Sequence, residues 1–348
     1  MSAQPTATPA SRLVVALVAA LAAPFATSRA QVPAGPARAD GVRVEQALQA
    51  LRQGRDVDAN LAALKEAIER SRDPAAVAQQ IGSVLLLDGR FALAADFLAL
   101  ARARRPDDGQ LALLLGRAQA QLHQFDPAIA QLEEAERLLP AGPRPQLHQF
   151  LAISLMGVQR FDQAEQRARR AIAEATQWNA ALPAGRAPLD VVDFELTLAQ
   201  VLHVAVRFGD ALALLTELAA RAKEPLDRSK IELLRAKILD TRGDEAGAAA
   251  AFAAAREATP ERVEALYEEA TFLARRRRHA EAKPLLEKVV ALEPDHEGAW
   301  FNLARLLPRL GDAAGGKRAM ERYSTVHAAK LADDERMTEL RRALDAKK

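Results

Sequence analysis

Residues 292–304, with the sequence LEPDHEGAWFNLA, indicate where one helix ends and the next begins. Pro294 lacks a backbone N–H and disfavours helical conformation in the residue before it, so the preceding helix should end there. The residues after the proline carry Trp300, Leu303 and Ala304 at helical spacing, which predicts a new helix. Because Ala304 is small, a second helix can approach this one closely at that point.

The small residue at the end of this stretch recurs through most of the chain. Counting upstream from Ala304, the intervals are 34, 34, 37, 47, 36 and 34 residues. The seven positions are Gly82, Gly116, Ala152, Ala199, Ala236, Ala270 and Ala304. Twelve residues after each of them lies another small residue: Ala94, Ala128, Ala164, Ala211, Ala248, Ala282 and Gly316. Antiparallel helices approach closely where small side chains face each other, so the paired positions predict a repeated helical hairpin.

Turn and end signals recur in step with the small residues. Three repeats place glycine seven positions after the first small residue, at Gly89, Gly243 and Gly311, where a turn with positive φ is expected. Four repeats have phenylalanine two positions later, at Phe91, Phe125, Phe161 and Phe208. Four repeats carry a proline that should end the second helix, at Pro106, Pro140, Pro260 and Pro294.

This framework resembles the tetratricopeptide repeat family, whose 34-residue unit is a helix–turn–helix with a Trp-x-x-Leu-Gly segment and a closing proline. Trp300, Leu303 and Ala304 match the first segment in step. The resemblance covers about residues 75–330 in seven repeats. It implies an all-α fold, an α-α superhelix in which antiparallel helix pairs form a right-handed solenoid.

The repeats set the expected domain boundaries. The array should span residues 42–331, with a degenerate N-terminal hairpin at Val44–Arg70 that turns at Gly54. The interval of 47 residues predicts a loop insertion at 177–190, which contains two prolines and a glycine. In the last repeat Pro308 falls near the end of the first helix, and Gly315 and Gly316 are expected to interrupt the second. Residues 332–348 should form a C-terminal capping helix.

The first thirty residues have the features of a secretory signal peptide. An apolar run extends from Leu13 to Ala23 after Arg12, and a small-residue site follows at Ser28–Ala30. The run is shorter than the roughly 20 apolar residues of a transmembrane helix. We therefore expect cleavage after Ala30, no stable membrane span afterwards, and a periplasmic or secreted protein. Residues 31–41 should be a flexible leader.

Composition excludes several classes of protein. Hydrophobic residues make up 49% of the 348 residues and aromatics only 4%, so the chain can bury a core rich in Ala and Leu and is not disordered. The scarcity of aromatic and β-branched residues disfavours an all-β fold. The chain has no cysteine, which excludes disulfides and thiolate metal sites. Cleavage after Ala30 would leave 46 basic and 46 acidic residues, so charge does not indicate a nucleic-acid partner.

No motif for catalysis, cofactor or metal emerges. Residues 311–318 approximate a phosphate-binding loop, but Arg318 stands where Ser or Thr would hold magnesium. His296 and Glu297 begin like a zinc-protease helix, but Trp300 occupies the second ligand position. The basic run at 275–278 falls at a turn between helices, where it is either solvated or in contact with an acidic partner. The sequence predicts a protein that is not an enzyme and that needs no cofactor or metal.

The family resemblance implies a binding groove lined by the first helix of each repeat, at positions three before, one after and four after the small residue. In the C-terminal repeats the first of these positions gives an apolar ladder, which consists of Leu196, Leu233, Tyr267 and Phe301. The ladder is edged by the cations Lys237, Arg305 and Arg309. The ladder either packs against neighbouring helices or receives an apolar or amphipathic segment with some negative charge. No repeat has Lys and Asn at the first two lining positions, the pair that binds C-terminal carboxylates in this family.

These features predict a non-catalytic scaffold for protein–protein interaction in the cell envelope, whose partner is another protein or a peptide segment. Two alternatives remain open. One is a protein that binds an envelope glycan or takes part in exopolysaccharide secretion, although the chain has only two Trp and two Tyr for sugar stacking. The other is a subunit of an enzyme that is active only in a complex.

Overall fold

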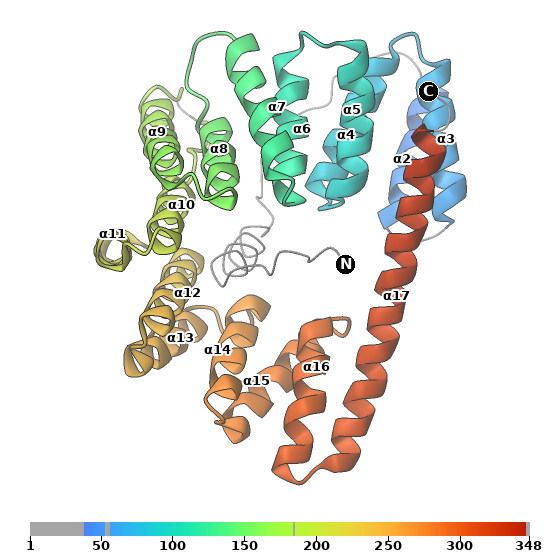
Figure 1. Ribbon diagram of the computed structural model, residues 1–348. Coiled ribbons are helices and arrows are strands. Elements are labelled where there is room, and N and C mark those ends of the chain that lie inside the picture. Colours follow the sequence, from blue (N-terminus) through green and yellow to red (C-terminus); the bar gives the residue numbers. More distant parts are fainter. Residues whose placement is uncertain (1–37, 53–55, 184, 346–348) are drawn as a thin grey trace, which may run out of the picture. The chain divides into compact units, whose positions relative to one another are not determined.

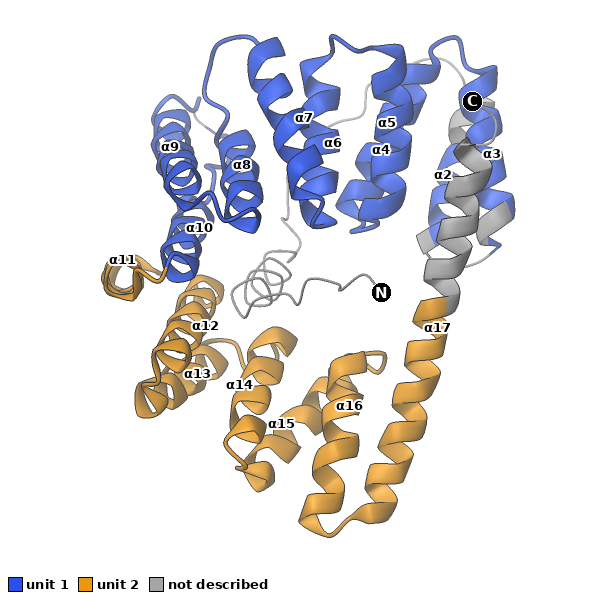
Figure 2. Ribbon diagram, viewed as in Figure 1, with its two compact units in different colours: residues 1–205 blue, residues 206–348 orange. Residues whose placement is uncertain are grey.

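The computed structural model describes residues 38–52, 56–183 and 185–345 (Figure 1), and these residues are helical with no strand. They form two compact units, residues 1–205 and 206–348 (Figure 2). In the first unit the helices are α2 (Arg38–Arg52), α3 (Val57–Arg70), α4 (Pro74–Leu87), α5 (Phe91–Arg104), α6 (Gly109–Gln121), α7 (Phe125–Leu138), α8 (Pro145–Gly157), α9 (Phe161–Ala180) and α10 (Val191–Val204). In the second they are α11 (Phe208–Arg221), α12 (Pro225–Arg242), α13 (Glu245–Ala258), α14 (Val263–Arg275), α15 (His279–Leu292), α16 (Glu297–Leu306), the 3-10 helix η2 (Leu307–Leu310) and α17 (Ala313–Asp345).

The small residues hold the two helices of each hairpin together, as predicted. A Cβ atom placed on Gly116 of α6 would lie 2.7 Å from Cγ of Leu132 and 3.2 Å from the carbonyl oxygen of Ala128, both on α7. The corresponding atom on Gly82 would meet Leu98 and the Ala94 carbonyl of α5 in the same way. The helices therefore touch backbone to backbone at these positions, where no larger side chain fits.

The turn inside each hairpin has one conformation throughout the array. The residue seven positions after the small residue has a positive φ in all seven repeats: Gly89, His123, Gln159, Val206, Gly243, Arg277 and Gly311. In six of them the next backbone N–H donates to the carbonyl five residues earlier, as Arg278 donates to Leu273 at 3.0 Å. This bond closes the end of the first helix and sets the start of the second. Four repeats thus place a side chain where the backbone favours glycine.

Proline and phenylalanine mark the helix ends that the sequence predicted. Helices α5, α7, α13 and α15 each end two residues before a proline, for example α7 at Leu138 before Pro140. Helices α5, α7, α9 and α11 each begin at phenylalanine. No helix among the described residues is both long and apolar enough to cross a membrane.

The structure corrects three boundaries. Helix α9 continues to Ala180, so the inserted loop begins at residue 181 rather than 177, and Asn179 of α9 holds the loop through two bonds to the backbone of Leu189. Helix α2 begins at Arg38, inside the segment expected to be a leader. Helix α17 is continuous from Ala313 to Asp345, so residues 332–345 extend it instead of forming a separate helix.

Gly315 and Gly316 were expected to interrupt the second helix of the last repeat, but both lie inside the continuous helix α17. A Cβ on Gly316 would lie 2.5 Å from Cγ of Pro308 and 3.2 Å from the Ala304 carbonyl oxygen. The backbone N–H of Gly315 donates to the carboxylate of Asp312 at 2.7 Å, which caps the start of α17. The signal peptide predicted at 1–30 and the turn at Gly54 lie outside the described residues.

Candidate functional site

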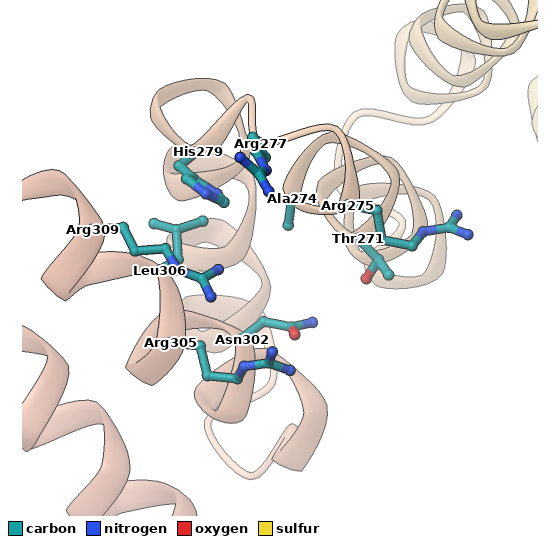
Figure 3. A pocket seen from close by; sticks show the side chains of 9 residues that line it. All are labelled: Thr271, Ala274, Arg275, Arg277, His279, Asn302, Arg305, Leu306 and Arg309. Carbon is teal, nitrogen blue, oxygen red and sulfur yellow. The ribbon is translucent and has the colours of Figure 1, made fainter.

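A pocket of about 520 Å³ lies in the second unit, between α14, the start of α15, α16 and η2 (Figure 3). Its volume falls in the range of roughly 300–1,000 Å³ that is common for small-molecule sites. The residues that line it are Thr271, Ala274, Arg275, Arg277, His279, Asn302, Arg305, Leu306 and Arg309. Four of the nine are arginines, so the pocket is cationic.

Helical spacing and the hairpin turn explain why these side chains converge. Asn302, Arg305 and Arg309 are separated by three and four residues, which places them on one face of α16 and η2. Arg277 lies in the turn between α14 and α15 with a φ of 60°, the left-handed conformation found at this position in every repeat. In Figure 3 its side chain lies beside that of His279, the first residue of α15.

Three of the four arginines in the pocket have no carboxylate partner among the described residues. Arg275 is neutralised, since its Nη2 lies 2.7 Å from the carboxylate of Asp240, which also pairs with Arg276. Arg277, Arg305 and Arg309 form no ion pair within the described part of the chain. Three guanidinium groups therefore share one pocket without a counter-charge, and an anion placed there would reduce their mutual repulsion.

Other polar side chains complete the lining. Nδ1 of His279 is buried and has no hydrogen-bond partner among the described residues. The side-chain amide of Asn302 donates to the hydroxyl of Tyr267 at 3.4 Å, at the edge of the pocket. Ala274 supplies apolar surface, and Leu306 beside it is buried. A buried polar atom of Thr271, its Oγ1, likewise has no partner among the described residues, so the site combines cations, two unsatisfied polar atoms and a small apolar surface.

An aromatic side chain lies next to the pocket. Phe301 is 37% exposed, and its ring centroid lies 5.3 Å from that of Tyr323 on α17. The guanidinium of Arg305 lies over the same ring at 5.3 Å, a cation–π distance. Arg305 therefore joins the aromatic surface at Phe301 to the cationic pocket.

The structure separates the residues of the predicted ladder. Arg305 and Arg309 line the pocket and Phe301 adjoins it, whereas Lys237 of α12 is engaged with Glu268 of α14 at 2.8 Å. Tyr267 is half-buried, with its ring 4.5 Å from that of His296, and burial raises the pKa of its hydroxyl.

Two members of the ladder belong to the core. Leu196 of α10 in the first unit is 5% exposed, and Leu233 of α12 in the second is 3% exposed. Leu233 packs in one cluster with residues such as Phe252 and Phe272. The family resemblance assigns both positions, three residues before the small residue, to the face that binds a partner. Because both side chains are buried, they offer no surface to a ligand.

Arg277, His279 and Asn302 were not among the predicted site residues. The basic run at 275–278 was the available signal, because it falls at the turn that the seven-residue offset defines. The sequence did not show which of its four arginines is free. The structure does, since Arg275 and Arg276 share Asp240 and Arg278 pairs with Glu281 at 2.7 Å.

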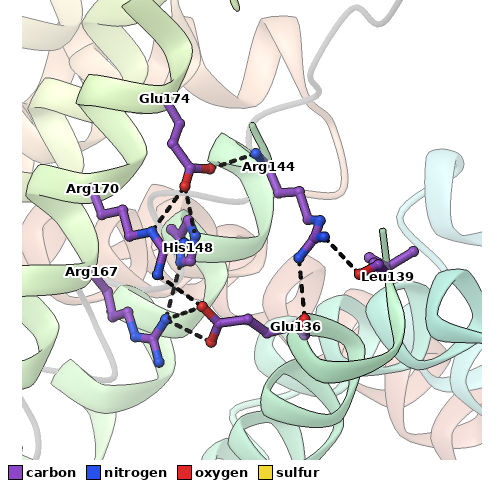
Figure 4. A network of polar contacts seen from close by, with 7 residues as sticks. All are labelled: Glu136, Leu139, Arg144, His148, Arg167, Arg170 and Glu174. Atoms are coloured by element: carbon purple, nitrogen blue, oxygen red, sulfur yellow. Dashed lines mark hydrogen bonds and ion pairs between the residues drawn. The ribbon is translucent and has the colours of Figure 1, made fainter. Parts of the chain in front are cut away.

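A second polar cluster, in the first unit, is structural (Figure 4). His148 of α8 is buried, with Nε2 3.2 Å from the carboxylate of Glu174 and Nδ1 3.3 Å from Nη1 of Arg167. Arg167 also pairs with Glu136 at 2.7 Å. Burial lowers the pKa of His148, and the arginine facing Nδ1 is consistent with a neutral ring. Because these groups satisfy one another across α7, α8 and α9, they leave nothing for a ligand.

No group of three or more possible metal ligands occurs in the residues that the structure describes. The fold and the pocket define a helical-repeat protein with a cationic pocket. A sequence profile of the tetratricopeptide repeat family matches residues 273–344, which contain most of this site. The described helices have the fold of a tetratricopeptide repeat solenoid, and residues 273–344 match a family whose members are generally non-catalytic scaffolds that bind other proteins.

Solved structures of this class are similar to the chain. A tetratricopeptide repeat protein from Parabacteroides merdae has a TM-score of 0.56 at 12% identity, over 77% of this chain and 98% of that one. PilF from Pseudomonas aeruginosa has a TM-score of 0.44 at 16% identity, over 68% of this chain and 99% of that one. Similarity at these identities concerns the fold alone. A search of curated proteins found no match.

Proposed function

We propose that this protein is a non-catalytic scaffold of the cell envelope, which binds a segment of a partner protein on the face formed by α14, α16 and η2. The observation that carries the proposal is the pocket with three unpaired arginines, Arg277, Arg305 and Arg309, next to the partly exposed ring of Phe301. Binding energy at protein interfaces concentrates in a few residues, and aromatic and arginine side chains are prominent among them.

The location in the envelope rests on the N-terminal sequence. The apolar run from Leu13 to Ala23 and the small-residue site at Ser28–Ala30 support export. N-terminal sequencing of protein purified from its native cell should find a chain that begins at or near Gln31 in the periplasmic or extracellular fraction. An intact Met1 or Ser2 in cytosolic protein would remove this part of the proposal.

The aromatic surface supplies the test of partner binding. Phe301→Ala should weaken binding of a partner recovered from envelope extract by at least about tenfold, since burying a large apolar side chain is worth roughly 1.5–3 kcal/mol. Trp178→Ala is the matched control, because Trp178 is a 44% exposed aromatic in the other unit. Circular dichroism should show both variants fully helical. Equal affinity of the two variants would contradict the proposed binding face.

Tyr267 is a poorer probe of binding than Phe301. Its hydroxyl packs closely against Gly298, since a Cβ atom placed on Gly298 would lie 2.4 Å from the hydroxyl oxygen. Its ring packs against His296. Tyr267→Ala should therefore lower stability as well as affinity, and the two effects have to be measured together.

A further inference from the structure

We propose that the pocket binds an acidic segment of a peptide chain, with at least two carboxylate side chains held by Arg277 on one wall and by Arg305 and Arg309 on the other. This inference rests on the proposed function, because it names the chemistry of the partner at the same face. It concerns carboxylates within a chain and requires no free C-terminus.

The arginines determine the charge and the geometry of the ligand. A guanidinium presents a planar set of N–H donors that matches a carboxylate with two parallel hydrogen bonds. The pair formed by Arg275 and Asp240 shows that an arginine of this pocket takes a carboxylate partner within the protein itself. Arg277, Arg305 and Arg309 have the same donors and no carboxylate partner among the residues that the structure describes, so a ligand can supply the acidic groups. Three free cations in one pocket call for more than one negative charge.

The volume and the apolar surface favour a chain over a single small ion. The cavity of about 520 Å³ has room for several side chains. Ala274 is a partly exposed apolar residue of the lining, against which the methylene groups of a glutamate side chain can pack while its carboxylate reaches an arginine. Glutamate fits this combination better than aspartate because its apolar stem is longer.

The polar lining favours a peptide over an inorganic anion. The side-chain amide of Asn302 lines the pocket and carries a carbonyl acceptor as well as N–H donors. Phosphate bound as an anion offers chiefly acceptors, whereas a peptide backbone carries both N–H donors and carbonyl acceptors. An acidic glycan also has both, but the nine lining residues include no phenylalanine, tyrosine or tryptophan ring on which a sugar could stack.

Fluorescence anisotropy of the full chain with a labelled hexaglutamate peptide, acetylated and amidated at its ends, tests the inference. The peptide should bind, and hexaglutamine of the same form should not. Arg305→Glu should weaken binding at least about tenfold, as expected when a charged partner is reversed in a pocket. Arg318→Glu is the matched control, because Arg318 is exposed on α17 and makes the same charge change outside the pocket. The control should bind like the unaltered protein.

Arg277→Gly separates recognition from folding. Glycine is favoured at this φ of 60°, so the variant should unfold at the same or a higher urea concentration than the unaltered protein. Its affinity for hexaglutamate should nevertheless fall severalfold, because one wall of the pocket loses its cation. Unchanged affinity would show that Arg277 does not contact the acidic segment.

The remaining outcomes overturn the inference in distinct ways. Equal losses in Arg305→Glu and Arg318→Glu would show attraction by overall charge rather than by the pocket. Stronger competition by inorganic phosphate or by oligogalacturonate than by unlabelled hexaglutamate would assign the pocket to another class of ligand. If a natural partner depends on Phe301 but binds Arg305→Glu with full affinity, the inference fails while the proposed function stands. If that partner depends on neither residue, the proposed function fails as well.

Discussion

Gly116→Ala should destabilise the protein, although alanine is the better helix former. Gly116 lies inside α6, where replacement of glycine by alanine ordinarily stabilises by about 0.5–1 kcal/mol. Here the added methyl carbon would lie 2.7 Å from Cγ and 3.0 Å from Cδ2 of Leu132. Carbon atoms pack best at about 3.5–4.0 Å, so α6 and α7 must separate or Leu132 must leave its rotamer.

The neighbours of Gly116 have no room to move. Leu132 is fully buried, and the Ala128 carbonyl, the other close neighbour, is part of the backbone of α7 and cannot move without the helix. Overpacking of this kind costs about 1–3 kcal/mol. The cost outweighs the gain in helix propensity, and the net loss in free energy of unfolding should be up to about 2.5 kcal/mol.

Urea unfolding followed by circular dichroism measures the effect against a matched control. A Cβ atom placed on Gly209 of α11 would have no neighbouring atom within 4 Å, so Gly209→Ala should keep the ordinary gain and unfold at a higher urea concentration. The two identical substitutions should therefore change the midpoint in opposite directions. A midpoint for Gly116→Ala at or above that of the unaltered protein would refute the close contact between α6 and α7.

Three further changes test other parts of the account. Ala248→Leu should lower the free energy of unfolding by about 1–3 kcal/mol, because Ala248 is fully buried. Ala254→Leu should lower it less, because Ala254 is partly exposed on the same helix. Equal urea midpoints for the two variants would contradict this. Val206→Gly should raise the free energy of unfolding by about 0.5–1 kcal/mol in the same assay. Val206 is a 69% exposed β-branched residue with a φ of 64°, a backbone conformation that glycine adopts without strain. A loss of stability would show that the backbone at Val206 is not strained. The lowered pKa of His148 means that the unfolded chain gains a proton first as the pH falls through the ordinary value of 6.5, so its contribution to stability is present above that pH and is lost below it. His148→Gln should flatten this part of the pH profile of stability, and an unchanged profile would contradict the assignment.

The repeat could be predicted from sequence because its contacts are local and steric. Gly116 and Ala128 are twelve residues apart, and close approach of their helices admits only small side chains, so composition at two positions reveals the hairpin. The turn at Gly89 could also be predicted, because glycine readily adopts the positive φ that this turn requires. The identical turns at Gln159 and Val206 were not, because the hairpin imposes the left-handed conformation on residues that do not favour it.

The site was predicted only in part because exposure depends on neighbouring helices. The family offset places Leu233 and Arg305 among the groove-lining positions of their helices, yet Leu233 is buried and Arg305 lines the pocket. Charge pairing is likewise a property of three dimensions. Asp240 lies 35 residues before Arg275, and only the structure shows that it neutralises Arg275 and leaves Arg277 free.

Hydrogen exchange of the full chain, with and without the hexaglutamate peptide, tests whether the partner binds at the face formed by α14, α16 and η2. Amide protection on binding should be confined to segments that contain residues 271–279 and 302–309, with no change in α4 to α9. Protection that maps to the first unit instead, or the absence of any protection at saturating peptide, would contradict binding at this face.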